Sequence, residues 1–366
     1  MRPIALLVLF LTLPGIAQPP IQPAPSPTPP VPSVPAEDAG YHLASGPCRV
    51  TTLDTLILHD EARGKDLRVK VRVPVPDPPA AAGSLPLVVF SHGLGGSKDV
   101  FADLCQHLAT HGYIVIAPSH ADSIIERSRQ GERVTRDTAF DIRQMTPKAK
   151  WERVADVTFI LDSLDELERR VDALRTPEGA GRIDRTRLAV AGHSAGAMTT
   201  QLIGGMKSRD PQNPAGTSKA DPRLKAAVVI SGQGVNGLGI REGAWDDVKI
   251  PWLVITGSLD TVSISNETPQ TRRHPFEKAR GVAQGGPPTY LLWIEGATHA
   301  SYQGKSATRL LRESPTTDLD VIEACVKSAV LAFLDRHVKG DPNAEEALSD
   351  ERFQRLSDGA ARLERK

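Results

Sequence analysis

The residues with the clearest capacity for chemistry are Gly192 to Gly196, which read GHSAG. A short apolar run at 187–191 favours a strand before them, and residues 197–203 favour a helix after them. A serine at the tip of a sharp strand-to-helix turn has a strained backbone, and glycines two positions away on each side let the strand and the helix approach. An ordinary glycine-rich turn is the alternative, but this context favours Ser194 as a nucleophile.

A serine hydroxyl is a weak nucleophile at neutral pH, so a histidine must accept its proton and an acid must orient that histidine. In a site of this kind the acid and then the histidine follow the serine in the chain, on loops after later strands. His299 stands just past a predicted strand at 289–294. The other late histidines are His274 and His337, and His337 falls within a predicted terminal helix. We therefore predict His299 as the base.

Asp260 is the predicted acid. A predicted strand at 251–256 runs into a glycine-containing loop that ends at Asp260 and can turn back towards the histidine. The earlier strand at 226–231 runs into GQG, which contains no carboxylate. Asp246 and Asp247 are the fallback pair, although they precede a strand. An exposed loop aspartate that accepts turn hydrogen bonds is the alternative interpretation of Asp260.

Two backbone amides must also stabilise the negative oxygen of a tetrahedral intermediate. Ala195 follows the serine directly, and a predicted strand at 85–91 runs into residues 92–96, which read HGLGG. Glycines there let the backbone approach a reacting carbonyl, so we predict the N–H groups of Leu94 and Ala195 as the oxyanion hole. The glycines do not fit a phosphate-binding loop pattern, so we expect neither nucleotide binding nor a cofactor.

Three more histidines lie beside these groups and could line the pocket. His92 and His193 flank the oxyanion loop and the nucleophile, and His120 follows a predicted strand at 113–118. We expect packing and hydrogen bonding rather than metal binding, because zinc sites normally gather three or four ligands. Cys105 falls on the apolar face of a helix and is predicted to be core.

The elements that position these residues alternate between apolar, β-branched runs and helical patterns. This alternation predicts an α/β fold, a mostly parallel sheet with helices on both faces. The short segment 231–250 leaves no room for a large cap domain, so we expect an open cleft. The remaining predicted strand is 67–74, and the main predicted helices are 98–111, 151–174 and 321–338.

The ends of the chain differ from its centre in composition. Residues 1–17 predict a signal peptide, because a basic start precedes an apolar run and small residues. Residues 18–40 predict a disordered, proline-rich tether. The catalytic domain is expected at 41–340 and a charged helical tail at 341–366. We therefore expect a secreted or periplasmic product without stable membrane insertion.

The charges of the chain balance. It has 44 Lys and Arg residues against 44 Asp and Glu residues, so its formal net charge is zero. Affinity for nucleic acid relies on clustered positive charge, so we expect no nucleic-acid partner. With a hydrophobic fraction of 40%, the chain can bury a substantial core.

Five segments together resemble the α/β-hydrolase superfamily: VVFSHGLGG at 88–96, APSHADS at 117–123, RLAVAGHSAGA at 187–197, ITGSLDT at 255–261 and IEGATHA at 294–300. Within it, the chain is similar to secreted predicted dienelactone hydrolases and to plasma-type platelet-activating factor acetylhydrolases. The resemblance implies Ser194 as nucleophile, His299 as base, and Leu94 with Ala195 as oxyanion hole.

The chain departs from both groups. Dienelactone hydrolases use a cysteine nucleophile, whereas this chain has a serine. The acetylhydrolases place their acid after the strand that follows the nucleophile helix, where this chain has Ser231-Gly232-Gln233. The surroundings of Asp260 and His299 are closer to those of secreted polyester and short-chain esterases.

These residues lead us to expect a secreted serine hydrolase that cleaves carboxylic esters with short or accessible acyl groups through an acyl-enzyme. Its substrate would be a small-molecule or polymer ester. Amide or peptide cleavage by the same triad is one alternative. A secreted binding module that has this fold but no activity is another, although candidates for all three triad positions argue against it.

Overall fold

The computed structural model describes residues 40–76, 83–135, 146–210, 213–235 and 239–366. The chain divides into two units, 1–33 and 34–366, and every described residue lies in the second. The predicted signal peptide and, apart from Gly40, the predicted tether therefore lie outside the described residues. In the part of the chain that is described, no helix is both long and apolar enough to cross a membrane.

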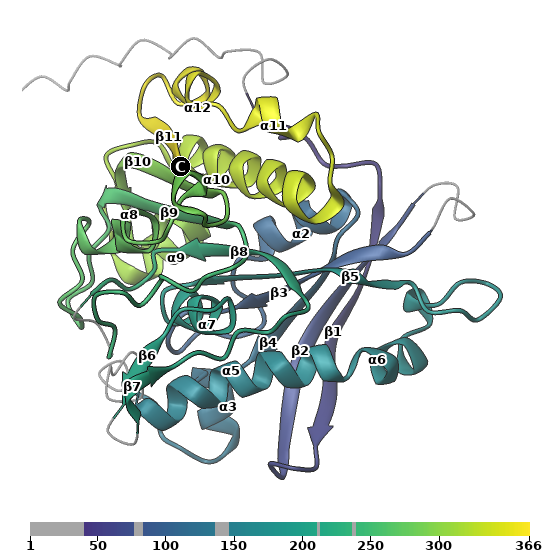
Figure 1. The fold of residues 1–366 in the computed structure, drawn as a ribbon. Coiled ribbons are helices and arrows are strands. Elements are labelled where there is room, and N and C mark those ends of the chain that lie inside the picture. The colour runs from purple at the N-terminus through teal and green to yellow at the C-terminus, as the bar shows by residue number, and fades with distance from the viewer. Residues whose placement is uncertain (1–39, 77–82, 136–145, 211–212, 236–238) are drawn as a thin grey trace, which may run out of the picture. The chain divides into compact units, whose positions relative to one another are not determined.

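The core of the second unit is a nine-stranded sheet (Figure 1) in the order β1-β2-β4-β3-β5-β8-β9-β10-β11. The six strands from β4 to β10 in this order are parallel, whereas β1, β2 and β11 pair antiparallel at the two edges. The strands are β1 Arg49–Asp60, β2 Lys65–Val75, β3 Leu85–Ser91, β4 Ile114–Ser119, β5 Ile183–His193, β8 Leu224–Ile230, β9 Trp252–Leu259, β10 Thr289–Thr298 and β11 Ala361–Arg365. Because parallel strands end at one edge, the loops after them gather there.

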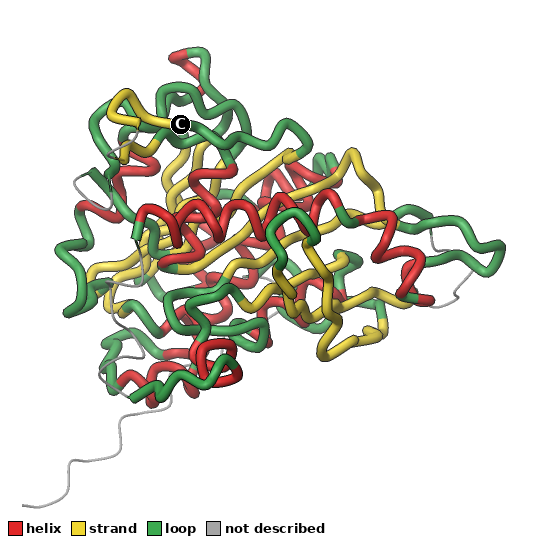
Figure 2. Tube along the Cα trace, turned by 90° about the horizontal axis from the view of Figure 1, so that it is seen from below, coloured by secondary structure: helices red, strands yellow, loops and turns green. Residues whose placement is uncertain are grey.

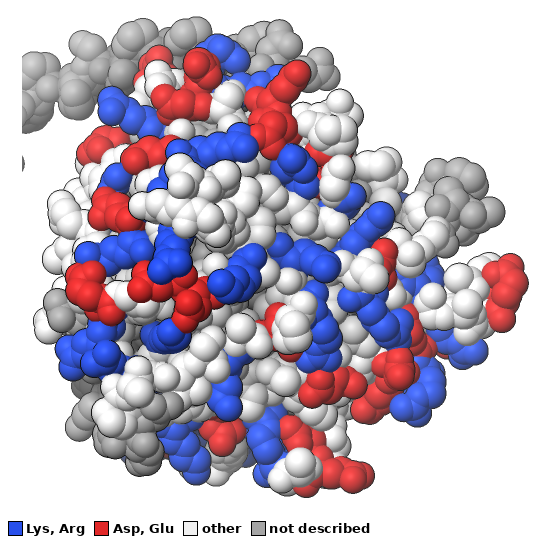
Figure 3. Space-filling view, in the orientation of Figure 1, with Lys and Arg blue, Asp and Glu red and all other residues white. Residues whose placement is uncertain are grey.

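Helices cover both faces of this sheet (Figure 1, Figure 2). The apolar residues of α2, α10 and α12 pack with one set of strand side chains, and those of α5, α6 and α7 pack with the other set. The predicted α/β class is therefore confirmed. The helices are α2 Ala102–Thr110, α5 Pro147–Asp162, α6 Leu164–Arg170, α7 Ala195–Ile203, α10 Leu319–Leu334 and α12 Asp350–Leu356. Positive and negative side chains are interspersed on the face seen in Figure 3.

The segments that connect the strands differ in the secondary structure that they contain. The described residues between β8 and β9 form turns and no helix, in line with the expected lack of a large cap domain. By contrast, a short helix, α3 Ile124–Arg129, lies between β4 and α5. Two short strands, β6 Ser208–Asp210 and β7 Asn213–Thr217, pair antiparallel after α7.

The helix predicted at 151–174 is divided in the structure. It begins earlier, at Pro147, because the Thr146 side chain accepts a hydrogen bond from the Ala149 N–H and proline suits the first turn. It ends at Asp162, and the Ser163 hydroxyl donates to the Phe159 carbonyl at 2.8 Å. Serine side chains that bond the backbone in this way weaken a helix locally.

The helical tail predicted for residues 341–366 is helical only in part. After α11 Ala344–Ala347 and α12, residues 361–365 form β11, which pairs antiparallel with β10. Ala361 and Leu363 are buried whereas the residues that follow each of them are exposed, which is the two-residue alternation of a strand. The segment was too short and too charged for this pattern to stand out in the sequence. It belongs to the sheet, where it covers the edge of β10 and is itself the last strand.

We predict that Leu363→Ala lowers the free energy of unfolding by about 2–3 kcal/mol, because it deletes a buried side chain opposite Leu292. Chemical denaturation followed by circular dichroism measures the change. Arg362→Ala, at the exposed neighbouring position, is the matched control and should stay within about 0.5 kcal/mol of the wild type. Equal stability of Leu363→Ala and wild type would show that β11 does not stabilise the sheet.

Candidate active site

Ser194 lies at the turn between β5 and α7, as the sequence predicts. Its backbone has φ 55° and ψ −116°, which is strained for a residue with a side chain. A Cβ at position 192 would lie 2.3 Å from the Gly196 carbonyl oxygen, and a Cβ at position 196 would lie 1.9 Å from the Ser91 carbonyl oxygen. Only glycine fits at either flank, so the spacing of the motif follows from the packing.

Asp260 and His299 come together at the ends of two adjacent parallel strands. Asp260 follows β9 directly, and His299 follows β10 directly. The His299 Nδ1 lies 2.9 Å from the Asp260 Oδ1, and both residues are buried. The predicted acid and base are therefore within hydrogen-bond distance, although 39 positions separate them in the chain.

Ser231 is a third group at this pair, and sequence reasoning missed it. It follows β8, has φ 54° and is fully buried. Its hydroxyl donates to the Asp260 Oδ1 at 2.8 Å and lies 2.7 Å from the His299 Nδ1. With the proton on Nδ1, this N–H is shared between the Ser231 oxygen and the Asp260 Oδ1, while the Ser231 hydrogen goes to the carboxylate. Its place at the end of a buried strand was the signal that could have revealed it.

The Asp260 carboxylate is held by several donors. The Thr256 and Tyr302 hydroxyls donate to its Oδ2, and the buried Arg272 Nε lies 3.0 Å from its Oδ1. Burial raises the pKa of Asp260, but the Arg272 guanidinium and the hydrogen bond from His299 outweigh burial and hold this pKa well below its ordinary value. Asp260 is therefore ionised at neutral pH.

His193 connects the nucleophile turn to the loop that carries the base. Its Nε2 donates to the His299 carbonyl oxygen at 2.9 Å, and the two rings lie 4.6 Å apart. Burial holds the pKa of His193 well below its ordinary value, so this ring is neutral. Within the described residues, no hydrogen bond joins the Ser194 hydroxyl to the His299 ring.

The predicted oxyanion loop packs against the nucleophile. A Cβ at Gly93 would lie 3.3 Å from the His193 Nδ1 and 3.5 Å from the Ser194 Cβ, so the loop lies directly against the nucleophile turn. The Ala195 N–H begins α7, and the first N–H groups of a helix have no partner within it. The Leu94 N–H also has no acceptor among the described residues. Both predicted donors are therefore available.

The histidines considered as pocket residues are not exposed to a cleft. His92, His120 and His193 are each no more than 2% exposed. His120 bonds Ser91 and Asp156, and His92 bonds the backbone. The structure thus supports the packing role. In the described ranges, no cluster of three or more His, Cys, Asp or Glu residues is arranged to hold a metal ion.

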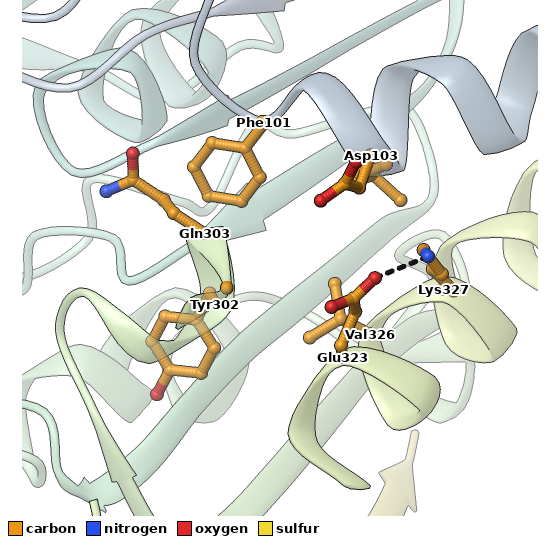
Figure 4. Close-up of a pocket in the computed structure, with 9 residues that line it drawn as sticks. Phe101, Asp103, Tyr302, Gln303, Glu323, Val326 and Lys327 are labelled. Carbon is orange, nitrogen blue, oxygen red and sulfur yellow. Dashed lines mark hydrogen bonds and ion pairs between the residues drawn. The ribbon is translucent and has the colours of Figure 1, made fainter. Parts of the chain in front are cut away.

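A small cavity lies to one side of these groups, between α2, the turn at Ser301–Gln303 and α10 (Figure 4). Phe101 and Tyr302 line it, and the pair of Glu323 with Lys327 stands at its edge. The Phe101 ring contacts the His193 ring, with 5.1 Å between their centres. Neither the predicted nucleophile nor the predicted base lines this cavity, so it lies beside the site.

We predict that Asp260→Asn lowers the free energy of unfolding at pH 7 by about 3 kcal/mol, because it leaves the buried Arg272 without its counter-ion. The pKa of Asp260 is lowered in the folded state, so its charge stabilises the fold above its ordinary value of 3.8. This stabilisation is lost as the pH falls below that value towards the lowered pKa. Denaturation at pH 7 and in steps below pH 4 should show the gap between variant and wild type narrowing, and a constant gap would contradict the interpretation.

The chain is similar to several known proteins. Residues 66–151 match the family model described as platelet-activating factor acetylhydrolase, isoform II. Over 310 residues the chain is 21% identical to a platelet-activating factor acetylhydrolase of Cavia porcellus, covering 76% of this chain and 63% of that protein. It is 24% identical to cutinase est1 of Thermobifida alba over 176 residues, 48% of this chain and 43% of the cutinase.

A third similarity is to chlorophyllase-1 of Arabidopsis thaliana, 30% identical over 80 residues and 22% of each chain. The chain thus spans less than two thirds of the length of each of these three relatives. The mostly parallel sheet, the turn at Ser194 and these similarities agree with one another. Together they identify the chain as having the fold of the α/β-hydrolase superfamily.

Proposed function

We propose that the protein is a serine hydrolase that cleaves carboxylic esters through an acyl-enzyme. The main observation in its support is that the candidate residues follow strands of one sheet. Ser194 lies in a strained turn after β5, and the Asp260 and His299 side chains lie 2.9 Å apart after β9 and β10. The similar proteins are named as an acetylhydrolase, a cutinase and a chlorophyllase. These names favour ester substrates for this chain as well.

In the proposed reaction, the Ser194 Oγ attacks the ester carbonyl carbon while its proton passes to the His299 Nε2. Nε2 is free to accept because Nδ1 carries the other proton and donates to Asp260. The Leu94 and Ala195 N–H groups stabilise the oxyanion. The carbon–oxygen bond to the alcohol then breaks, and His299 returns the proton to that alcohol. Water next attacks the acyl-enzyme, with the same proton transfers, and releases the acid and Ser194.

The electrostatics of the site support this sequence of steps. Asp260 is ionised at neutral pH, so it stabilises the imidazolium that forms when His299 takes the proton. Catalytic hydrogen bonds often tighten only when substrate binds, and we propose this for Ser194 and His299.

We further propose that the protein is exported and acts on esters with short or accessible acyl groups, in small molecules or polymers. The apolar run within residues 1–17 supports export. The turns after β8, in place of a helical cap, support an accessible site for the described part of that segment.

We predict that Ser194→Ala lowers kcat for ester hydrolysis by about 10⁴-fold or more, because it removes the nucleophile. A fluorophosphonate probe should label the wild type and leave Ser194→Ala unlabelled. Ser84→Ala changes an exposed serine just before β3 and is the matched control, with wild-type rate and labelling. Failure of the wild type to react with the probe would favour a binding module, whereas turnover of amides but not of esters would favour the amidase alternative.

We predict graded losses at the two groups that contact the His299 Nδ1. Asp260→Asn should lower kcat by about 10⁴-fold, because it removes the charge and favours the wrong tautomer. Ser231→Ala should lower kcat by about 10-fold with KM unchanged, because it removes one hydrogen bond and leaves the charge in place. Steady-state kinetics on a soluble ester measures both. Equal losses in the two variants would show that the acid has no special role.

A further inference from the structure

A second buried group of polar side chains lies beside the oxyanion loop at residues 92–96, and the proposed mechanism does not use it. Its members come from the ends of β3 and β4, from the loop after β4, and from α5. None is more than 7% exposed. They are Ser91, His92, His120, Asp122, Arg153 and Asp156. Buried charges are costly unless they are paired, so such a cluster requires an explanation.

Part of this cluster has the connectivity of a catalytic triad. The Ser91 hydroxyl lies 2.9 Å from the His120 Nε2, and the His120 Nδ1 lies 2.8 Å from the Asp156 Oδ2. Ser91 and His120 are fully buried, so no substrate reaches this hydroxyl. These three residues therefore connect the ends of β3 and β4 to α5 and do not form a second nucleophilic site.

Arg153 is the group in this cluster that contacts the loop directly. Its Nε and Nη2 donate to the two carboxylate oxygens of Asp122 at 2.8 and 2.7 Å. Its Nη1 donates to the His92 carbonyl at 2.8 Å, and its Nη2 reaches the Gly93 carbonyl at 3.3 Å. Asp122 in turn accepts the Gly95 N–H at 3.0 Å. One ion pair thus holds the loop at three backbone groups.

The His92 ring donates a further hydrogen bond to the Gly93 carbonyl. Its Nε2 accepts from the His120 backbone N–H at 2.9 Å, so the proton lies on Nδ1. Nδ1 then donates to the Gly93 carbonyl at 2.6 Å, and the Gly96 N–H donates to it as well. The Gly93 carbonyl is therefore turned towards the buried cluster.

This orientation determines the direction of the Leu94 N–H. The Gly93 carbonyl and the Leu94 N–H belong to one planar trans peptide, so they point in opposite directions. Because the carbonyl points to Arg153 and the His92 ring, the N–H points away from the cluster. Gly93 itself lies against Ser194. The bonds that hold the carbonyl therefore aim the predicted oxyanion donor.

We propose that Arg153, with Asp122 as its counter-ion, is a positioning residue that fixes the Leu94 N–H in the oxyanion hole. The proposal rests on the proposed ester hydrolysis. Preorganised donors are effective only if they are held in place before charge develops on the substrate oxygen. Arg153 does not contact the substrate. It affects the transition state only through the loop backbone that it holds in place.

The test compares Arg153→Lys with Arg223→Lys. Lysine keeps the charge but cannot make the same set of bonds. Arg223 bonds the Leu161 carbonyl and Asp162 at the far end of α5, so it anchors the same helix without touching the loop. We expect Arg153→Lys to lower kcat by about 10- to 100-fold with KM within about two-fold, because a donor is misaligned. Arg223→Lys should keep the wild-type kcat.

A second readout separates positioning from a general loss of structure. A trifluoromethyl ketone forms a tetrahedral adduct with the Ser194 Oγ, in which the former carbonyl oxygen occupies the oxyanion hole. Its affinity for Arg153→Lys should fall by the same factor as kcat, while the midpoint of thermal unfolding shows that the variant is folded. If Arg153→Lys does not fold, Asp122→Asn, which keeps the size of the side chain, should lower kcat by about 10-fold.

A folded Arg153→Lys with wild-type kcat and inhibitor affinity would overturn the proposal, and so would an equal loss in Arg223→Lys. The wild type is measured first on the same ester. If it neither hydrolyses the ester nor reacts with the fluorophosphonate, the proposed function fails and this inference fails with it. If the wild type is active, only the role of Arg153 is in question.

Discussion

The backbone of Ser194 is the constraint on which the site depends. A residue with a side chain adopts φ 55° and ψ −116° only where its surroundings hold it there. The glycines at 192 and 196 let β5, α7 and the end of β3 pack closer than any Cβ would allow. Because the Ser91 carbonyl lies against Gly196, the same contact brings the loop after β3 next to the nucleophile. One tight turn therefore sets the places of both the hydroxyl and the oxyanion loop.

Much of the fold could be predicted because the central strands are buried on both faces. The run at 85–91 is apolar almost throughout, and β3 has these bounds in the structure. Strand β1 was not predicted, because its residues are mostly exposed and its pairing with β2 is irregular between Leu53 and Leu56. Strand β11 was not predicted either, because its charged side chains resemble those of a surface helix. Edge elements depend on their partners more than on their own patterns.

The residues of the candidate site also fall into those that could be predicted from the sequence and those that could not. Asp260 and His299 could be predicted because each lies a few residues past a predicted strand, in the order expected after a nucleophile. Arg272 and Arg153 could not, because neither lies at a strand end, and their partners are distant in the chain. The bond from Arg153 to the His92 carbonyl spans 61 positions. Local sequence reveals the groups that follow strand ends, whereas the two arginines that hold them become visible only once the chain is folded.

The position of Ser231 shows that the histidine can be contacted from the ends of two different strands. It lies at the end of β8, and its oxygen is 2.7 Å from the same imidazole nitrogen that Asp260 contacts from the end of β9. Two neighbouring strands therefore offer alternative attachment points for a carboxylate beside one nitrogen. The place of the histidine therefore does not by itself fix which strand must supply the acid.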